Sequence, residues 1–182
     1  MPDDAEYHTP TRSTVRRYLQ QMDPERFEHF VADFWERLGW RTRVVGEPGD
    51  RGIDVIATAT TDEGGPQKQL IQAKRYGPNT TVGSPEVQQY ASLRLQADDV
   101  DQVTIVTTGG FSRQAEDMAP DLDVILVDGE ELLGLIEETD AWDVVAEHVD
   151  GIELADAVDR NPSQSEEPNR SGILGKLLSV FR

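Results

Sequence analysis

The stretches GIDVIATAT at positions 52–60 and QKQLIQAKR at positions 67–75 decide which fold this chain of 182 residues can adopt. The first stretch is rich in β-branched residues and the second has an apolar centre, so both predict strands. Residues 62–66 between them end in Gly64-Gly65-Pro66, which predicts a turn. We therefore expect the two strands to form an antiparallel hairpin.

Three polar side chains on this hairpin suggest a functional site. Gln72 and Lys74 are two residues apart on the second strand, and side chains alternate between the two faces of a strand. Gln72 and Lys74 therefore share a face, and antiparallel pairing can bring Asp54 of the first strand beside them. A carboxylate, an amide oxygen and an ammonium group would then converge.

This combination suits the hydrolysis of a phosphodiester bond. Mg²⁺ prefers oxygen ligands, which Asp54 and Gln72 can supply, and a bound metal ion polarises a phosphate and activates water. Lys74 would orient the water or stabilise charge in the transition state. A strand with a solvated polar face is the alternative. Two features argue against it: Gln72-Ala73-Lys74 closes an otherwise apolar strand, and residues 49–54 put acids at a loop-to-strand junction, where sites are often built.

The remainder of the chain to about residue 150 alternates helix and strand patterns. Helices are predicted at 11–21, 23–38, 84–96, 112–119 and 128–138, and strands at 40–45, 102–108 and 122–127. Asp23 is a good N-cap, Pro24 suits the first helical position, and Gly39 is a natural stop. Helices and strands in this order predict an α/β fold with a mixed central β-sheet flanked by helices.

The net charge of -18 is unevenly distributed along the chain. Residues 10–95 carry 12 Lys and Arg against 11 Asp and Glu, whereas residues 96–182 carry 5 against 21. A charge-balanced, Arg-rich first half is compatible with one face that meets a polyanion. Three lysines beside fourteen arginines and 35 acids resemble the composition of proteins from salt-accumulating halophiles, and we expect a halophilic protein.

Composition excludes several classes of protein. The chain contains no cysteine, so disulfides, thiol catalysis and thiolate metal sites are excluded. No apolar run approaches the ~20 residues that span a bilayer. Residues 1–10 are acidic and polar and do not resemble a signal peptide. We expect a soluble cytoplasmic protein.

The C-terminal part has a different character. Residues 151–171 are acidic, polar and proline-bearing and predict a disordered linker. Residues 172–182 again show apolar residues at helical spacing. This segment is too short to form a stable isolated helix. We expect this amphipathic segment to dock outside the catalytic core. The surface that buries the apolar stripe is left open, and the alternatives are the chain's own core, a second subunit, a protein partner and an anionic membrane surface.

Residues 19–135 resemble the catalytic domain of Mrr-type restriction endonucleases, in the PD-(D/E)XK nuclease superfamily. The matching pieces are Phe27-Glu28, Leu38-Gly39-Trp40, Gly49-Asp50-Arg51-Gly52-Ile53-Asp54, Gln72-Ala73-Lys74-Arg75-Tyr76 and Val106-Thr107-Thr108-Gly109-Gly110-Phe111-Ser112. Each piece is short, but their order and spacing together are specific. The resemblance implies a restriction-endonuclease-like α-β-β-β-α-β core over residues 23–150, after an N-terminal helical extension at 1–22.

The resemblance also implies roles for individual residues. Asp54 takes the position of the metal-binding acid, and Lys74 takes that of the lysine. Gln72 replaces the Glu or Asp found in much of the superfamily, and Gln is a known variant among Mrr-like proteins. Glu28 matches a helical acid that often completes such sites, and Asp50 is either a further ligand or a loop cap. The implied cofactor is Mg²⁺, with Mn²⁺ as the alternative.

The implied activity is a metal-dependent endonuclease that hydrolyses DNA phosphodiester bonds and restricts foreign or modified DNA. Candidate contacts with DNA are Arg51, Arg75, Tyr76 and Gln89, the last only if the 84–96 helix packs near the hairpin. A nuclease resembling Holliday-junction resolvases is one alternative. A catalytically silent module that binds DNA or a partner is another, because Gln72 removes a charge from the site. A homodimer is one expected assembly of the chain.

Overall fold

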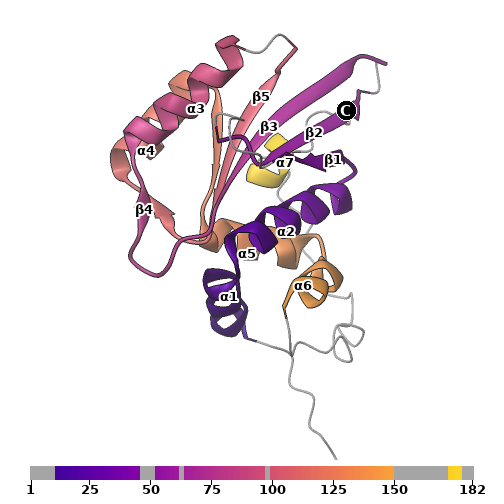
Figure 1. The fold of residues 1–182 in the computed structure, drawn as a ribbon, viewed down its shortest axis with the longest axis vertical. Helices are drawn as coiled ribbons and strands as arrows, with labels where there is room; N and C mark the ends of the chain where they lie inside the picture. The colour runs from indigo at the N-terminus through magenta and orange to yellow at the C-terminus, as the bar shows by residue number, and fades with distance from the viewer. Residues whose placement is uncertain (1–10, 46–51, 62–63, 97–98, 150–171, 178–182) are drawn as a thin grey trace, which may run out of the picture.

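A five-stranded sheet with helices on both faces forms the centre of the molecule (Figure 1). The computed structural model describes residues 11–45, 52–61, 64–96, 99–149 and 172–177. The predicted loop around Asp50, the whole predicted linker and both ends of the chain lie outside these ranges. The predicted α/β class with a mixed sheet is confirmed.

The sheet has the strand order β1-β2-β3-β5-β7. Its strands are β1 (Arg41–Val44), β2 (Val55–Thr60), β3 (Pro66–Lys74), β5 (Gln102–Thr107) and β7 (Val124–Val127). β1, β2 and β3 pair antiparallel, and β3, β5 and β7 pair parallel. The predicted hairpin is therefore present, with Val55 opposite Ile71 and Thr60 opposite Pro66. β3 joins the antiparallel half of the sheet to the parallel half.

Helices cover both faces of this sheet (Figure 1). They are α1 (Arg12–Gln21), α2 (Pro24–Arg37), α3 (Ser84–Gln96), α4 (Arg113–Met118), the 3-10 helix η1 (Ala119–Leu122), α5 (Gly129–Glu138), α6 (Trp142–His148) and α7 (Ile173–Leu177). Asp23 caps α2 by accepting from the Glu25 amide at 3.0 Å, as predicted. Helix α6 was not predicted from the sequence.

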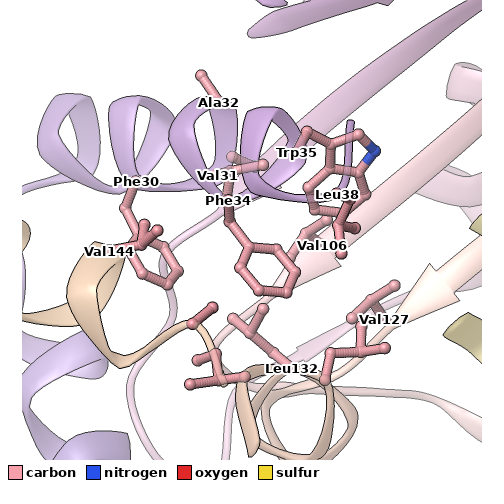
Figure 2. Close-up of a cluster of buried hydrophobic side chains, with 14 of the residues drawn as sticks. Phe30, Val31, Ala32, Phe34, Trp35, Leu38, Val106, Val127, Leu132 and Val144 are labelled. Atoms are coloured by element: carbon pink, nitrogen blue, oxygen red, sulfur yellow. The ribbon is translucent and has the colours of Figure 1, made fainter. Parts of the chain in front are cut away.

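The main core lies between α2 and the sheet. Phe27, Phe30, Phe34 and Trp35 of α2 are all fully buried, and they meet strand residues such as Val106 and Val127 and helix residues such as Leu132 and Val144 (Figure 2). Their 3,4 spacing puts them on one side of the helix, which is the face predicted from the sequence. This packing holds the start of α2, where Glu28 lies, against the sheet.

A second core lies under α3 and α4 on the other face of the sheet. Leu70 of β3 faces this second core, whereas its neighbours Ile71 and Ala73 face the main core. The alternation puts Gln72 and Lys74 on the side of α3, as the period of a strand requires. It also means that the hairpin carries its polar side chains toward a helix that lies next to it.

A small second sheet, also absent from the sequence prediction, pairs β4 (Thr81–Val82) with β6 (Gly110–Phe111). The chain approaches itself closely here, because a Cβ added to Gly109 would collide with the carbonyl oxygen of Thr80. The Gly109-Gly110 turn therefore serves backbone packing between the loop before α3 and the end of β5.

Strand β1 lies at the edge of the large sheet. On the side away from β2, the Glu36 carboxylate of α2 accepts from the Thr42 hydroxyl at 3.0 Å and from the Thr42 amide at 3.4 Å. A side chain thus fills a hydrogen-bonding position that a further strand would otherwise take.

The two terminal helices that the structure describes both join the main core. Val15 and Leu19 of α1 and Leu174 and Leu177 of α7 are buried within it. Helix α7 packs against β7, so the chain's own core receives this part of the amphipathic segment. Among the described residues, no helix is long and apolar enough to cross a membrane.

Candidate active site

Asp54 directly precedes β2, and Gln72 and Lys74 lie at the end of β3. The Asp54 backbone is fixed on both sides, because its amide donates to the Ile71 carbonyl at 3.1 Å and its carbonyl accepts from the Val45 amide at 2.8 Å. The Asp54 carboxylate also accepts from the Ala73 amide at 2.8 Å. These bonds across the hairpin hold the acid beside the end of β3.

Gln72 contacts Asp54 directly, since its amide nitrogen Nε2 donates to the Asp54 oxygen Oδ2. Both side chains are buried, with exposed fractions of 5% and 8%. The other end of the amide, Gln72 Oε1, is a buried acceptor without a hydrogen-bond partner among the described residues. Such an oxygen is costly to bury unless a ligand completes its coordination.

Burial shifts the acidity of the two carboxyl groups. It raises the pKa of Asp54 from 3.8 to about 6, against the opposing effects of the Ala73 amide, Lys74 and Gln72. Burial and then the negative charge of Asp54 raise the pKa of Glu28 on α2 from 4.5 to about 7. Glu28 therefore lies close enough to Asp54 to be coupled to it electrostatically, and both acids bind protons more tightly than free carboxyl groups.

Lys74 is half-buried, and its ammonium nitrogen lies 5.4 Å from the centre of the Tyr90 ring on α3. Burial alone would lower the pKa of Lys74, but the hydroxyl of Tyr90, the side chain of Tyr76 and the charge of Asp54 together raise it. Lys74 is therefore charged at neutral pH. Tyr90 was not predicted as a site residue. From the sequence alone, Tyr90 cannot be distinguished from any other aromatic residue on the buried face of a helix.

The residues expected to contact DNA occupy varied positions. Arg75 is half-buried and donates to the carbonyl of Gln20, at the end of α1, at 3.5 Å. The Tyr76 hydroxyl donates to Glu86 at 3.2 Å. Burial and then the nearby Glu86 carboxylate raise the pKa of Tyr76. Helix α3 does pack near the hairpin, but there it presents Tyr90 to Lys74 and leaves Gln89 exposed.

The structure leaves two candidates from the sequence undescribed and pairs two arginines of α1 with acidic residues. Asp50 and Arg51 belong to residues 46–51, outside the described ranges. Arg12 and Arg16 of α1 form ion pairs with Glu130 of α5, and Arg12 also pairs with Glu137 at 2.6 Å. These two arginines therefore fix α1 to α5.

The donor set fits a hard divalent cation. In the described part of the chain, no group of three or more His, Cys, Asp and Glu side chains could hold a metal ion. Two coupled carboxyl groups and the unpartnered oxygen of Gln72 are present instead. All three offer oxygen, the ligand that Mg²⁺ and Mn²⁺ prefer, and the remaining positions on such an ion are commonly filled by water. A cation would satisfy the buried amide oxygen and lower both raised pKa values.

Comparison with known proteins identifies the family of the chain. Residues 19–136 match the Mrr catalytic-domain family, described as restriction endonuclease. The type IV methyl-directed restriction enzyme EcoKMrr of Escherichia coli strain K12 is 37% identical over 132 residues, which cover 69% of this chain and 42% of EcoKMrr. The chain thus spans about two fifths of the length of this relative.

Two solved structures share the fold. The DNA modification-dependent restriction endonuclease AspBHI is 25% identical with a TM-score of 0.60, over 82% of this chain and 43% of that one. The MspJI restriction endonuclease in complex with a 27-mer oligonucleotide is 21% identical with a TM-score of 0.55, over 99% of this chain and 41% of that one. The family match covers well over half of the residues and confirms the resemblance drawn from the sequence. The chain belongs to the Mrr-type restriction endonuclease family.

Proposed function

We propose that this chain is a divalent-metal-dependent endonuclease that hydrolyses phosphodiester bonds of foreign or modified DNA. The observation that carries the proposal is the convergence of Asp54 and Gln72, from neighbouring strands, with Lys74 and Glu28 close by. Family membership supports the reaction class.

Asp54 and Gln72 would hold the metal ion, with Glu28 as a further acidic group beside them. Mg²⁺ is the proposed ion and Mn²⁺ the alternative, and when bound it would polarise the phosphate and acidify a water molecule. Asp54 provides the negative charge that binds a cation. Gln72 Oε1 provides a neutral oxygen that has no other partner in the described structure.

Lys74 and Glu28 have complementary roles in this proposal. The Lys74 ammonium is charged and lies near Asp54, so it can stabilise negative charge that develops on the phosphate. Glu28 lies close to Asp54, and a cation bound there would lower its raised pKa, so that Glu28 would be ionised near neutral pH and could accept a proton from attacking water.

The substrate is inferred from two relatives of the chain. EcoKMrr is methyl-directed and AspBHI is modification-dependent, and this chain matches less than half of each. We infer that the substrate of this chain is likewise DNA that carries modified bases. Arg51, Arg75, Tyr76 and Gln89 remain the candidates for contacts with the DNA backbone.

A cleavage assay tests the function. Purified protein is incubated with methylated and unmethylated plasmids and with a four-way junction, in Mg²⁺, in Mn²⁺ and in EDTA, at high KCl. We expect metal-dependent cleavage that is fastest on methylated plasmid. Asp54→Ala and Lys74→Ala should each lower the rate by at least about 100-fold. Lys68→Ala, which removes the other lysine of β3, should cleave like the parent protein.

Two outcomes would replace this proposal. A strong preference for the junction would identify a junction-resolving nuclease. Binding of DNA without cleavage in either metal would identify a silent module, in which the hydrogen bond from Gln72 to Asp54 is structural.

A further inference from the structure

Tyr90 occupies an unusual place for an aromatic residue of a core. It lies on α3 and is 5% exposed, within the second core. One face of its ring carries the Lys74 ammonium at 5.4 Å from the ring centre. Its ring edge and hydroxyl lie 3.2 Å and 3.3 Å from the point where a Cβ on Gly52 would stand. Tyr90 thus reaches both the lysine of the candidate site and the turn that leads into Asp54.

The contact with Lys74 is attractive for a physical reason. The face of an aromatic ring is electron-rich and attracts a cation within about 6 Å of its centre, most strongly where water is partly excluded. A lysine side chain has four rotatable bonds, and fixing it in one place costs conformational entropy. A ring that holds the ammonium beforehand removes part of this cost from the reaction.

Gly52 allows the contact to form. Its φ angle of +81° is one that residues with side chains rarely adopt. A Cβ at Gly52 would also lie 3.2 Å from Gln72 Oε1. The missing side chain therefore leaves room for both Tyr90 and the Gln72 amide beside Gly52, two residues before Asp54.

We propose that Tyr90 is a positioning residue whose ring face holds the Lys74 ammonium beside Asp54 and Gln72, with Gly52 leaving room for it. Tyr90 acts on the reaction through Lys74. The inference rests on the proposed nuclease function, since Lys74 has a catalytic role only if phosphodiester bonds are cleaved.

Substitutions on α3 separate the ring from the hydroxyl and from the fold. Tyr90→Phe keeps the ring face, and Tyr90→Leu removes it. Leu93→Ala is the matched control, because Leu93 is buried in the same core at 6% exposure, one turn further along α3. Each variant is compared by melting temperature, by DNA affinity without divalent metal, and by the single-turnover cleavage rate in Mg²⁺.

We expect Tyr90→Leu to lower the cleavage rate by about 10-fold to 100-fold, as displacement of a catalytic group does, while DNA affinity stays unchanged. Tyr90→Phe should lower the rate by no more than about 3-fold, because it keeps the ring face and removes only the hydroxyl that also acts on Lys74. Leu93→Ala should lower the melting temperature and leave the rate unchanged.

A second readout does not depend on cleavage. The chain has three lysines, Lys68, Lys74 and Lys176, so trace labelling with an amine reagent at fixed pH can be followed for each by mass spectrometry. Labelling of Lys74 relative to the other two should rise most in Tyr90→Leu, less in Tyr90→Phe, which loses only the hydroxyl that raises the Lys74 pKa, and stay unchanged in Leu93→Ala. Lys68 and Lys176 serve as internal references.

Three results would overturn the inference: a parent-like rate in Tyr90→Leu, an equal loss in Tyr90→Phe and Tyr90→Leu, or unchanged labelling of Lys74 in Tyr90→Leu. If the parent protein cleaves no DNA, the proposed function fails. The labelling comparison still shows in that case whether Tyr90 holds Lys74.

Discussion

Gln72 brings an uncharged amide to a position where much of the superfamily has a carboxylate. In this structure the amide nitrogen satisfies Asp54 and leaves Gln72 Oε1 buried without a partner among the described residues. A second carboxylate there would add repulsion to an acid whose pKa burial has already raised to about 6. The amide therefore makes the metal-free folded protein more stable than a carboxylate would, but it contributes no negative charge to cation binding.

The substitution Gln72→Glu tests this balance. We expect the metal-free protein to melt at a lower temperature at pH 8, because a third buried acid joins Asp54 and Glu28. We expect Mg²⁺ to restore the melting temperature, with an apparent affinity raised by about tenfold by the added charge. Melting curves in EDTA and across a Mg²⁺ series measure both effects.

Gln69→Glu is the matched control on the same strand. Gln69 is also buried, where it accepts from Trp35 Nε1 at 2.5 Å and donates to Thr104 at 2.8 Å. This variant should be destabilised without any recovery in Mg²⁺. Equal recovery in both variants would remove Gln72 from the metal site.

The raised pKa values of Asp54 and Glu28 predict how stability depends on pH. The folded protein holds these protons to higher pH than the unfolded chain, from 3.8 to about 6 and from 4.5 to about 7. Their contribution to the free energy of unfolding is therefore largest below pH 4 and is lost as the pH rises through 7. We expect the melting temperature in EDTA to fall from pH 5 to pH 8.

Glu28→Gln should flatten the upper part of this decline, because the group with the higher pKa is then absent. Metal binding requires deprotonated carboxylates, so the affinity for Mg²⁺ should rise over the same pH range. A melting temperature in EDTA that does not change between pH 5 and pH 8 would contradict the assignment of buried, protonated acids.

At the scale of elements, β3 organises the site. Residues 66–71 of β3 pair antiparallel with β2 and residues 69–74 pair parallel with β5, and the strand carries both Gln72 and Lys74. The hairpin could be predicted from sequence because the apolar pattern and the Gly-Gly-Pro turn are local signals. The shared face of Gln72 and Lys74 followed from the period of a strand alone.

Contacts that depend on the packing of separate elements could not be predicted in this way. Tyr90 and Glu86, the acidic partner of Tyr76, both lie on α3. The helical pattern of α3 predicts a helix but not the strand against which it packs. The strands β4 and β6 have two residues each, too few for a periodic signal. The ion pairs of Arg12 and Arg16 with Glu130 also join two separate helices, α1 and α5, and no local pattern in the sequence predicts them.

Helix α7 is short enough that its stability must come from the core it joins. Leu177 is fully buried against the main core, so Leu177→Ala should lower the free energy of unfolding by about 2 kcal/mol. Lys176→Ala changes the exposed residue next to Leu177 and should alter the free energy of unfolding by less than about 0.5 kcal/mol. Denaturant titration measures both, and equal stability of the two variants would mean that α7 does not contribute to the fold.

At the scale of the whole molecule, the net charge of -18 opposes folding through self-repulsion. Salt screens this repulsion, since the Debye length falls from about 10 Å at 0.1 M to about 3 Å at 1 M. We expect the melting temperature to rise across a KCl series to about 1 M, even though the exposed pairs of Arg12 weaken.

A variant with Asp117→Asn, Asp121→Asn and Glu138→Gln, all at exposed positions, serves as the control for this effect. It should melt at a higher temperature than the parent in low salt and respond less to KCl. If the parent protein melts at the same temperature in low and molar salt, the result contradicts the expectation of a halophilic protein.

The hydrogen bonds from Thr42 to Glu36 have a consequence for how copies of this protein behave when crowded together. An open strand edge is a template on which a neighbouring molecule can add a strand of its own, and extended aggregates begin in this way. Glu36 occupies one such position on β1 and brings a negative charge to it, so an approaching strand must displace a carboxylate to pair there. The same acid that anchors α2 to β1 thereby helps to keep the protein dispersed at high concentration.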